Sequence, residues 1–227
     1  MRYLFLIGFL FSSPALAGAL DDLRDCSPNM NARAKCLIRV NDIHPTQFAV
    51  GMHEVKKKKE KIEEMDKGER QDYLAENPVP VVIGPKGIFY AIDHHHLSRA
   101  VYESGHTKMA ALVKENWGGT TVDAFWKKMG GMNYVYLIDE NGHGPKSPAQ
   151  LPREMSRLAD DPFRSIAGMA RDEDCYKKST QPFAEFRWAE YFRSRIKYED
   201  SYKDALKAAL KICHIAAAKD LPGYTSR

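Results

Sequence analysis

Several familiar catalytic and membrane signatures are missing from this chain of 227 residues. After Gly18 no stretch is long and apolar enough to cross a bilayer, which takes roughly 20 such residues. Glycine-rich P-loops and nucleophile-elbow serines are absent, so neither P-loop enzymes nor α/β-hydrolases are favoured. The four cysteines lack the spacing of a zinc site. A formal net charge of +4 is too small to indicate nucleic acid by itself.

Residues 1–17 have the features of a cleavable secretory signal. A positive start at Arg2 is followed by the apolar residues 3–11, and an Ala-Leu-Ala cleavage site ends at Ala17. The alternative is an uncleaved anchor, but the apolar run falls short of the roughly 20 residues that a membrane span needs. We therefore expect cleavage after Ala17 and a periplasmic or secreted protein.

An exported protein meets an oxidising compartment, where cysteines favour disulfides over metal thiolates. Four cysteines allow three connectivities. Proximity in sequence suggests one pair near the amino terminus, Cys26 with Cys36, and one that ties back the last helix, Cys175 with Cys213.

Hydrophobic periodicity predicts an α+β protein. We expect a short helical segment over residues 18–40 and a chain break near Pro45. The other predicted helices are 54–74, 94–104 and 122–129, and the predicted strands are 79–83, 88–92, 109–113 and 134–138. The strands 79–83 and 88–92 form a hairpin, and the C-terminal third is mainly helical.

The most unusual local feature is Asp93-His94-His95-His96, which places three of the eight histidines where a strand gives way to a helix. A helix start attracts anions and disfavours protonation of an imidazole there. Neutral imidazoles can accept a proton or bind a metal ion. Because successive helical residues point about 100 degrees apart, at most two of the rings can share a site. The alternative is a structural histidine cluster, and for Asp93 an N-cap role ranks above catalysis.

Positive charge near this junction could come from Arg99 on the same helix and from Lys56 on the preceding one. Further along the chain, Asp161 followed by proline is explained as a helix N-cap with Pro at N1. Glu185 lies on an aromatic-rich helix, and we expect it to form a buried ion pair with Arg164 or Arg187.

The stretch VVIGPKGIFYAIDHHHLSRA at residues 81–100 resembles the core of the ParB/sulfiredoxin superfamily, in which a hairpin leads into a helix that opens with Gly-Glu-Arg-Arg or Asp-Gly-His-His. HPTQFAVG at 44–51, DPFRS at 161–165 and FAEF at 183–186 add support. Over residues 40–195 the chain looks closest to the bacterial ParB-like nuclease branch. The resemblance implies a small mixed sheet with flanking helices at 41–145 and a helical extension packed on it at 146–227.

In the superfamily this helix start binds phosphate groups, which assigns phosphate binding here to Ser98, Arg99 and Lys56. The sequence departs from the pattern, because His95 and His96 replace an arginine pair. His94 and Asp93 replace an acidic residue and a glycine. Exchanging fixed cations for imidazoles favours proton transfer or metal binding over a simple grip on a triphosphate. The sulfiredoxin cysteine is absent from this junction, so that reductase chemistry does not carry over.

These observations predict a nuclease or phosphodiesterase that acts outside the cytoplasm, with His95 or His96 as general base or metal ligand and His94 and Asp93 as further catalytic candidates. Nucleic acid or another phosphate-bearing ligand would be its partner, and a divalent metal ion is the cofactor that such a site could hold. Two alternatives stay open: a non-catalytic module of the cell envelope that binds an anion or a partner, and an enzyme acting on another small anion.

Overall fold

The computed structural model describes residues 19–226. The predicted signal peptide at residues 1–17 lies outside this range. The described chain confirms the α+β prediction, with seven α-helices and a mixed five-stranded sheet. Among the helices of residues 19–226, none combines the length and apolar character that crossing a bilayer requires.

The five-stranded sheet has the order β1-β6-β4-β5-β2. Its strands are β1 (Lys35–Arg39), β2 (Ile43–His44), β4 (Val79–Ile83), β5 (Phe89–Ala91) and β6 (Lys108–Asn116). The predicted hairpin is confirmed, because β4 and β5 pair antiparallel with Val82 opposite Tyr90. The central pair β4 and β6 is parallel. The short strands β3 (Ala49–Val50) and β7 (Ala159–Asp160) pair separately, so the segment after Pro45 is fastened to the chain just before the C-terminal helices.

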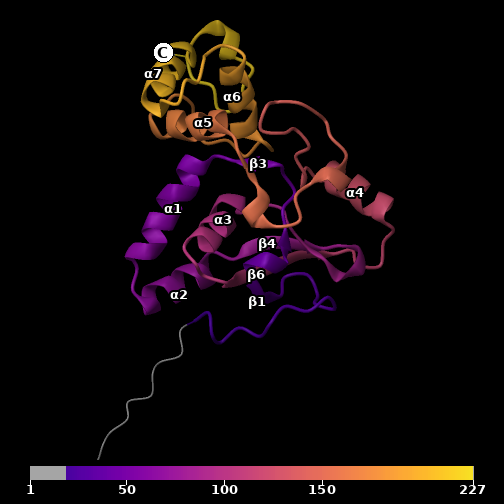
Figure 1. Ribbon diagram of the computed structural model, residues 1–227. Helices are drawn as coiled ribbons and strands as arrows, with labels where there is room; N and C mark the ends of the chain where they lie inside the picture. The colour runs from indigo at the N-terminus through magenta and orange to yellow at the C-terminus, as the bar shows by residue number, and fades with distance from the viewer. Residues whose placement is uncertain (1–18, 227) are drawn as a thin grey trace, which may run out of the picture.

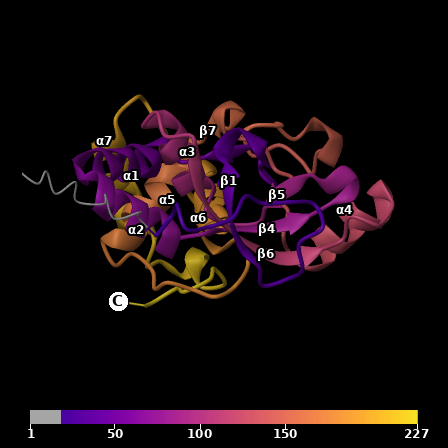
Figure 2. The ribbon, with the colours of Figure 1, turned by 90° about the horizontal axis from the view of Figure 1, so that it is seen from below.

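Helices cover the sheet from different sides. They are α1 (Met52–Glu64), α2 (Lys67–Glu76), α3 (His95–Glu103), α4 (Val122–Gly131), α5 (Pro162–Asp172), α6 (Ala184–Arg193) and α7 (Tyr202–Ile212). Both ribbon views place α4 across the sheet from α1 and α2 (Figures 1 and 2). Helix α3 packs on α1, and α1 in turn contacts α5.

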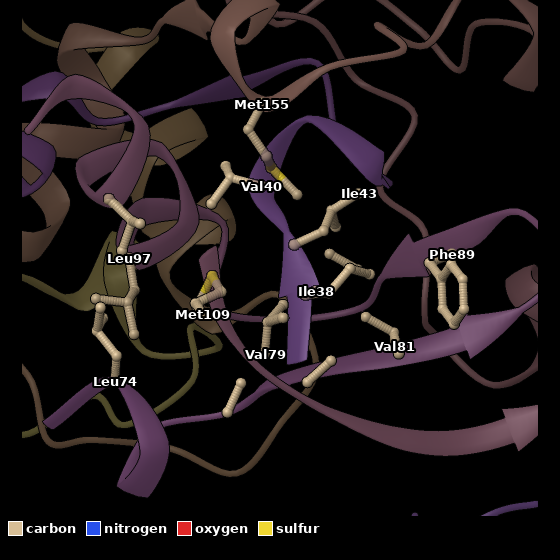
Figure 3. Close-up of a cluster of buried hydrophobic side chains, with 14 of the residues drawn as sticks. Ile38, Val40, Ile43, Leu74, Val79, Val81, Phe89, Leu97, Met109 and Met155 are labelled. Carbon is tan, nitrogen blue, oxygen red and sulfur yellow. The ribbon is translucent and has the colours of Figure 1, made fainter. Parts of the chain in front are cut away.

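The main hydrophobic core lies between the sheet and helices α1 to α3. Figure 3 shows side chains from the strands and from Leu74 and Leu97 converging there, with Met155 closing one side. A second cluster belongs to α5, α6, α7 and the segments that follow α5 and α7, and it is built around Trp188, Tyr176 and Phe192. The three C-terminal helices gather at one end of the molecule (Figure 1). Two separate apolar cores therefore face each other, and polar residues fill part of the space between them.

Both expected cysteine pairs lie at disulfide distance. Cys26 and Cys36 have Cα atoms 5.0 Å apart, and Cys175 and Cys213 have Cα atoms 5.7 Å apart. The second pair joins the segment after α5 to the end of α7, inside the second hydrophobic cluster.

Three secondary-structure predictions are wrong. Residues 19–40 form turns and β1 instead of a helix, because the Cys26 N–H donates to the Leu37 carbonyl and the Leu37 N–H to the Arg24 carbonyl. The helix predicted over 54–74 is two helices, since Asp66 caps α2 in a capping box with Glu69. Residues 134–138 form no strand.

The failed strand has a local explanation. The Tyr136 N–H donates to the Thr46 carbonyl, and the Leu137 carbonyl accepts from the Lys146 N–H. These isolated bonds to two different segments replace a continuous ladder. The apolar side chains that suggested a strand are instead drawn into a small cluster beside α4, where Val135 is buried.

Candidate functional site

His95 is a buried clamp between the start of α3 and the segment after Pro45. Its Nε2 accepts a hydrogen bond from the Thr46 N–H at 3.1 Å. The ring also hydrogen-bonds the Ala91 backbone, and the Thr46 hydroxyl donates to the same carbonyl at 2.6 Å. Burial lowers the pKa of His95 from 6.5 to about 4. The ring is therefore neutral, as predicted, but burial is the main cause and both ring nitrogens are occupied.

His96 binds the same segment at a second residue, Gly51. Its Nε2 accepts from the Gly51 N–H at 3.1 Å, so the proton of the neutral ring is on Nδ1. Burial, followed by the charge of Arg164, lowers the pKa of His96 well below 6.5. Glycine is needed at position 51, because a Cβ there would lie 2.7 Å from the Ser165 backbone nitrogen. The ring thus stands where α1, α3 and α5 meet.

His94, and not Asp93, occupies the N-cap position of α3, which corrects the expected capping role of Asp93. His94 has left-handed backbone angles, φ 58° and ψ 24°. The Asp93 Oδ1 accepts the N–H of His94 at 2.7 Å and caps no later amide. The Nδ1 of His94 is buried without a hydrogen-bond partner in the described chain. A buried polar atom without a partner calls for an explanation, and a missing ligand is one.

An arginine-carboxylate-arginine cluster faces these histidines from the C-terminal helices. Arg164 and Arg171 lie two turns apart on α5, and both form ion pairs with Glu185 of α6. The Arg164 partner of Glu185 is one of the two predicted alternatives. Burial lowers the pKa of Arg164 to about 10, which leaves it cationic at neutral pH. Its Nε has no hydrogen-bond partner within the described residues.

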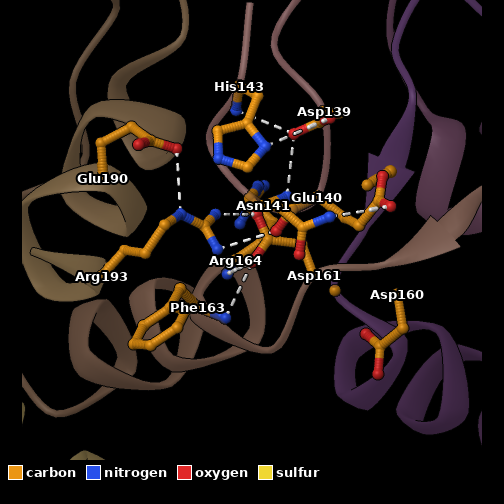
Figure 4. Close-up of polar contacts among 12 residues, drawn as sticks. Asp139, Glu140, Asn141, His143, Asp160, Asp161, Phe163, Arg164, Glu190 and Arg193 are labelled. Atoms are coloured by element: carbon orange, nitrogen blue, oxygen red, sulfur yellow. Dashed lines mark hydrogen bonds and ion pairs between the residues drawn. The ribbon is translucent and has the colours of Figure 1, made fainter. Parts of the chain in front are cut away.

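A polar network fixes the start of α5, and therefore Arg164. As predicted, Asp161 caps this helix, and its Oδ1 accepts from the Phe163 and Arg164 N–H groups. Its other oxygen accepts from Arg193 Nη2 at 2.7 Å, while Arg193 Nη1 donates to the Glu140 carbonyl. Figure 4 shows Arg193 reaching from α6 into this network. Three chain segments are thereby locked around the amino end of α5.

A cavity of about 340 Å³ lies beside the start of α3 and is lined by the imidazoles of His94 and His96. Its charged lining consists of four cations and three carboxylates: Lys58, Arg164, Arg171 and Lys178 with Glu54, Asp93 and Glu185. Lys58 is paired with Glu54 at 3.1 Å. The balance is one positive charge, so the cavity favours an anion.

The three residues expected to bind phosphate lie elsewhere. Arg99 Nη1 donates to the carbonyls of Met155, Ser156 and Leu158, and its Nε pairs with Glu103 at 2.7 Å. Lys56 is exposed, and its Nζ is 3.9 Å from Glu60. Ser98 is fully buried and lines neither of the two cavities described for residues 19–226. We therefore do not retain these three residues in the proposed site.

A metal-binding arrangement does not form around the junction. Among residues 19–226, no three His, Cys, Asp or Glu side chains come close enough together to hold a metal ion. The Nε2 atoms of His95 and His96 already accept backbone N–H groups. The arrangement suits anion binding and proton transfer by His94 better than metal ligation.

Sequence reasoning missed two cations of the cavity, Arg171 and Lys178. Arg171 could have been found from its spacing, because residues seven apart on a helix share a face and Arg164 had already been considered. Lys178 follows Cys175 in a loop, and no local pattern links it to α3. Its place depends on how α5 and α6 pack.

The protein is of the mixed α+β class. Its hairpin leads into a helix start, and beside this start lies a cavity with a net positive lining. The family described as "Putative ParB-like nuclease" matches residues 36–194. The crystal structure of protein Atu1540 from Agrobacterium tumefaciens is similar, with a TM-score of 0.80 and 36% identity over 86% of this chain and 97% of that one. No curated protein matches. The chain belongs to the ParB-like nuclease family.

The clamp by His95 should make stability depend on pH. In the folded protein the ring stays neutral down to about pH 4, whereas the unfolded ring takes up a proton near pH 6.5. This contribution to stability is complete above pH 6.5 and is lost progressively as the pH falls from 6.5 to about 4. At roughly 1.4 kcal/mol per pKa unit, the loss is about 3 kcal/mol.

Urea unfolding across this pH range tests the clamp. In the His95→Gln variant the amide can still accept the Thr46 N–H but does not titrate, so its free energy of unfolding should fall less steeply with acid. Equal slopes for the wild type and the variant would contradict the assignment.

Proposed function

We propose that this protein is a phosphodiesterase of the nuclease type that binds a substrate phosphate between the start of α3 and the guanidinium groups of α5. One observation carries the proposal: Arg164 and His94 line the same cavity, and each has a buried nitrogen, Arg164 Nε and His94 Nδ1, without a hydrogen-bond partner in the described chain. Burying a polar atom without a hydrogen bond costs about 1–3 kcal/mol, which a bound ligand would recover.

The cations have defined parts in this proposal. Glu185 holds Arg164 and Arg171 in fixed orientations, so their remaining N–H groups are ready to donate to phosphate oxygens. Lys178 adds a further positive charge to the cavity lining. His96, neutral and protonated on Nδ1, would donate a further hydrogen bond. Fixed donors of this kind stabilise the charge that develops when phosphorus is attacked.

His94 takes the role of general base in this scheme. His95 cannot serve, because its ring nitrogens are engaged with the backbone around Thr46 and Ala91. The unpartnered Nδ1 of His94 is free to accept a proton from the attacking water. The proton moves to the imidazole, the water oxygen bonds to phosphorus, and the ester oxygen leaves.

Replacing His94 tests the proposal. Hydrolysis of bis(p-nitrophenyl) phosphate, single-stranded DNA and RNA is measured with and without Mg²⁺ and Mn²⁺. The His94→Ala variant should lose roughly 10²- to 10⁴-fold in kcat, as expected for removal of a general base. His106→Ala is the matched control, since His106 follows the same helix and lines neither cavity.

Two results would count against the proposal. Equal turnover by wild type and His94→Ala would remove His94 from the mechanism. Saturable phosphate binding without turnover on any diester would instead support the alternative, a non-catalytic anion-binding module of the cell envelope.

We also propose that the protein acts outside the cytoplasm. Support comes from the two cysteine pairs at disulfide distance, since disulfides persist in oxidising compartments. Intact mass measurement of protein from the extracytoplasmic fraction should give an amino terminus at Gly18 and no free thiol. A cytoplasmic protein that retains Met1 and carries reduced cysteines is the opposing result.

A further inference from the structure

A second cavity, of about 640 Å³, adjoins the first. The two share Asp93, Arg164, Arg171, Lys178 and Glu185, so the cluster of cations forms the boundary between them. The remaining lining residues of the two cavities differ in chemical type. The smaller one is lined mainly by charged and imidazole groups, whereas the larger one also has aromatic and apolar walls.

The aromatic walls come from two segments far apart in sequence. Tyr134 follows α4, and Phe183 and Phe186 stand at the start of α6. All three side chains are only partly buried. Tyr136 supports the two phenylalanines: its ring stacks on Phe186 with 4.0 Å between ring centres, and it is tilted against Phe183 with 5.0 Å between ring centres. The two rings at the start of α6 are therefore held in place by a neighbour outside the cavity lining.

Phe183 adopts an unusual backbone conformation. Its φ of 57° is left-handed, which is a genuine outlier for a bulky residue and costs energy that glycine would avoid. A phenylalanine in this strained backbone conformation suggests that its aromatic ring has a function.

A cation and an aromatic ring are in contact at the boundary. The Arg164 Cζ lies over the Phe186 ring, 5.2 Å from its centre. A phosphate held by Arg164 would therefore have an aromatic wall next to it. Nucleotides present this same pair of groups, an anion and a flat ring. Aromatic side chains bind unpaired bases by stacking, with little preference for sequence.

We propose that the larger cavity takes the base of a nucleotide whose phosphate lies at Arg164 and Arg171, which makes single-stranded nucleic acid the substrate class. This inference rests on the proposed phosphate site. It excludes intact duplex, because a base must leave its stack to enter a cavity lined by Tyr134 and Phe183.

Calorimetric titration compares thymidine 5′-monophosphate, 2-deoxyribose 5-phosphate and inorganic phosphate. The two esters differ only in the base, and neither contains a diester to be cleaved. The wild type should bind the nucleotide about 5- to 100-fold more tightly than the sugar phosphate, the range expected for stacking of one base.

Two variants each remove one aromatic ring from the cavity lining. Phe183→Gly suits the left-handed backbone and so should keep the fold, and Tyr134→Leu keeps an apolar side chain. Each should reduce the preference for the nucleotide several-fold while leaving the affinity for inorganic phosphate unchanged. Tyr102→Leu is the matched control, because Tyr102 is exposed on α3 and lines neither cavity.

The outcomes separate this inference from the proposed function. Equal binding of nucleotide and sugar phosphate by the wild type, or a preference that survives both aromatic variants, overturns the base site and leaves the phosphate site intact. Failure of all three compounds to bind overturns both.

Discussion

The ion-pair cluster of Arg164, Glu185 and Arg171 is the constraint on which the arrangement of this protein depends. It lies between two hydrophobic cores, one under the sheet and one among α5, α6 and α7. Removing charges from water is costly unless each has a partner, so α5 and α6 must stay in register. The Arg193 network holds that register, and the Cys175–Cys213 pair ties the segment after α5 to the end of α7. The same requirement that orders the helices also places cations opposite the start of α3.

The three histidines at the start of α3 have different structural roles. His95 and His96 each accept one backbone N–H from the segment between Thr46 and Gly51, and so fasten that segment to the helix. Arginines could not do this, because a guanidinium has no acceptor atom. With histidines in these places, the positive charge beside the cavity comes from Arg164 and Arg171 of α5, and the Nδ1 of His94 has no partner in the described chain.

Features set by neighbouring residues could be predicted from the sequence, whereas features set by contacts between distant parts of the chain could not. The β4 and β5 hairpin and helix α3 follow from local patterns and were predicted, and Gly105, at φ 75°, follows the end of this helix. Residues 19–40 failed because pairing with Leu37 overrides local helix preference. The hydrogen-bond partners of His95 and Arg99 could not be foreseen for a related reason, since Thr46 and Met155 are about 50 residues away in the chain.

Phosphate binding by an Arg171→Gln variant tests the central claim most directly. This change leaves Glu185 paired with Arg164 and removes one guanidinium from the cavity. We predict saturable binding of inorganic phosphate by the wild type and a loss of about tenfold or more in the variant, as expected for a charged hydrogen bond. Arg157→Gln, an exposed change away from both cavities, should bind as the wild type does. Equal affinity in all three proteins, or no binding by the wild type, would contradict an anion site between α3 and α5.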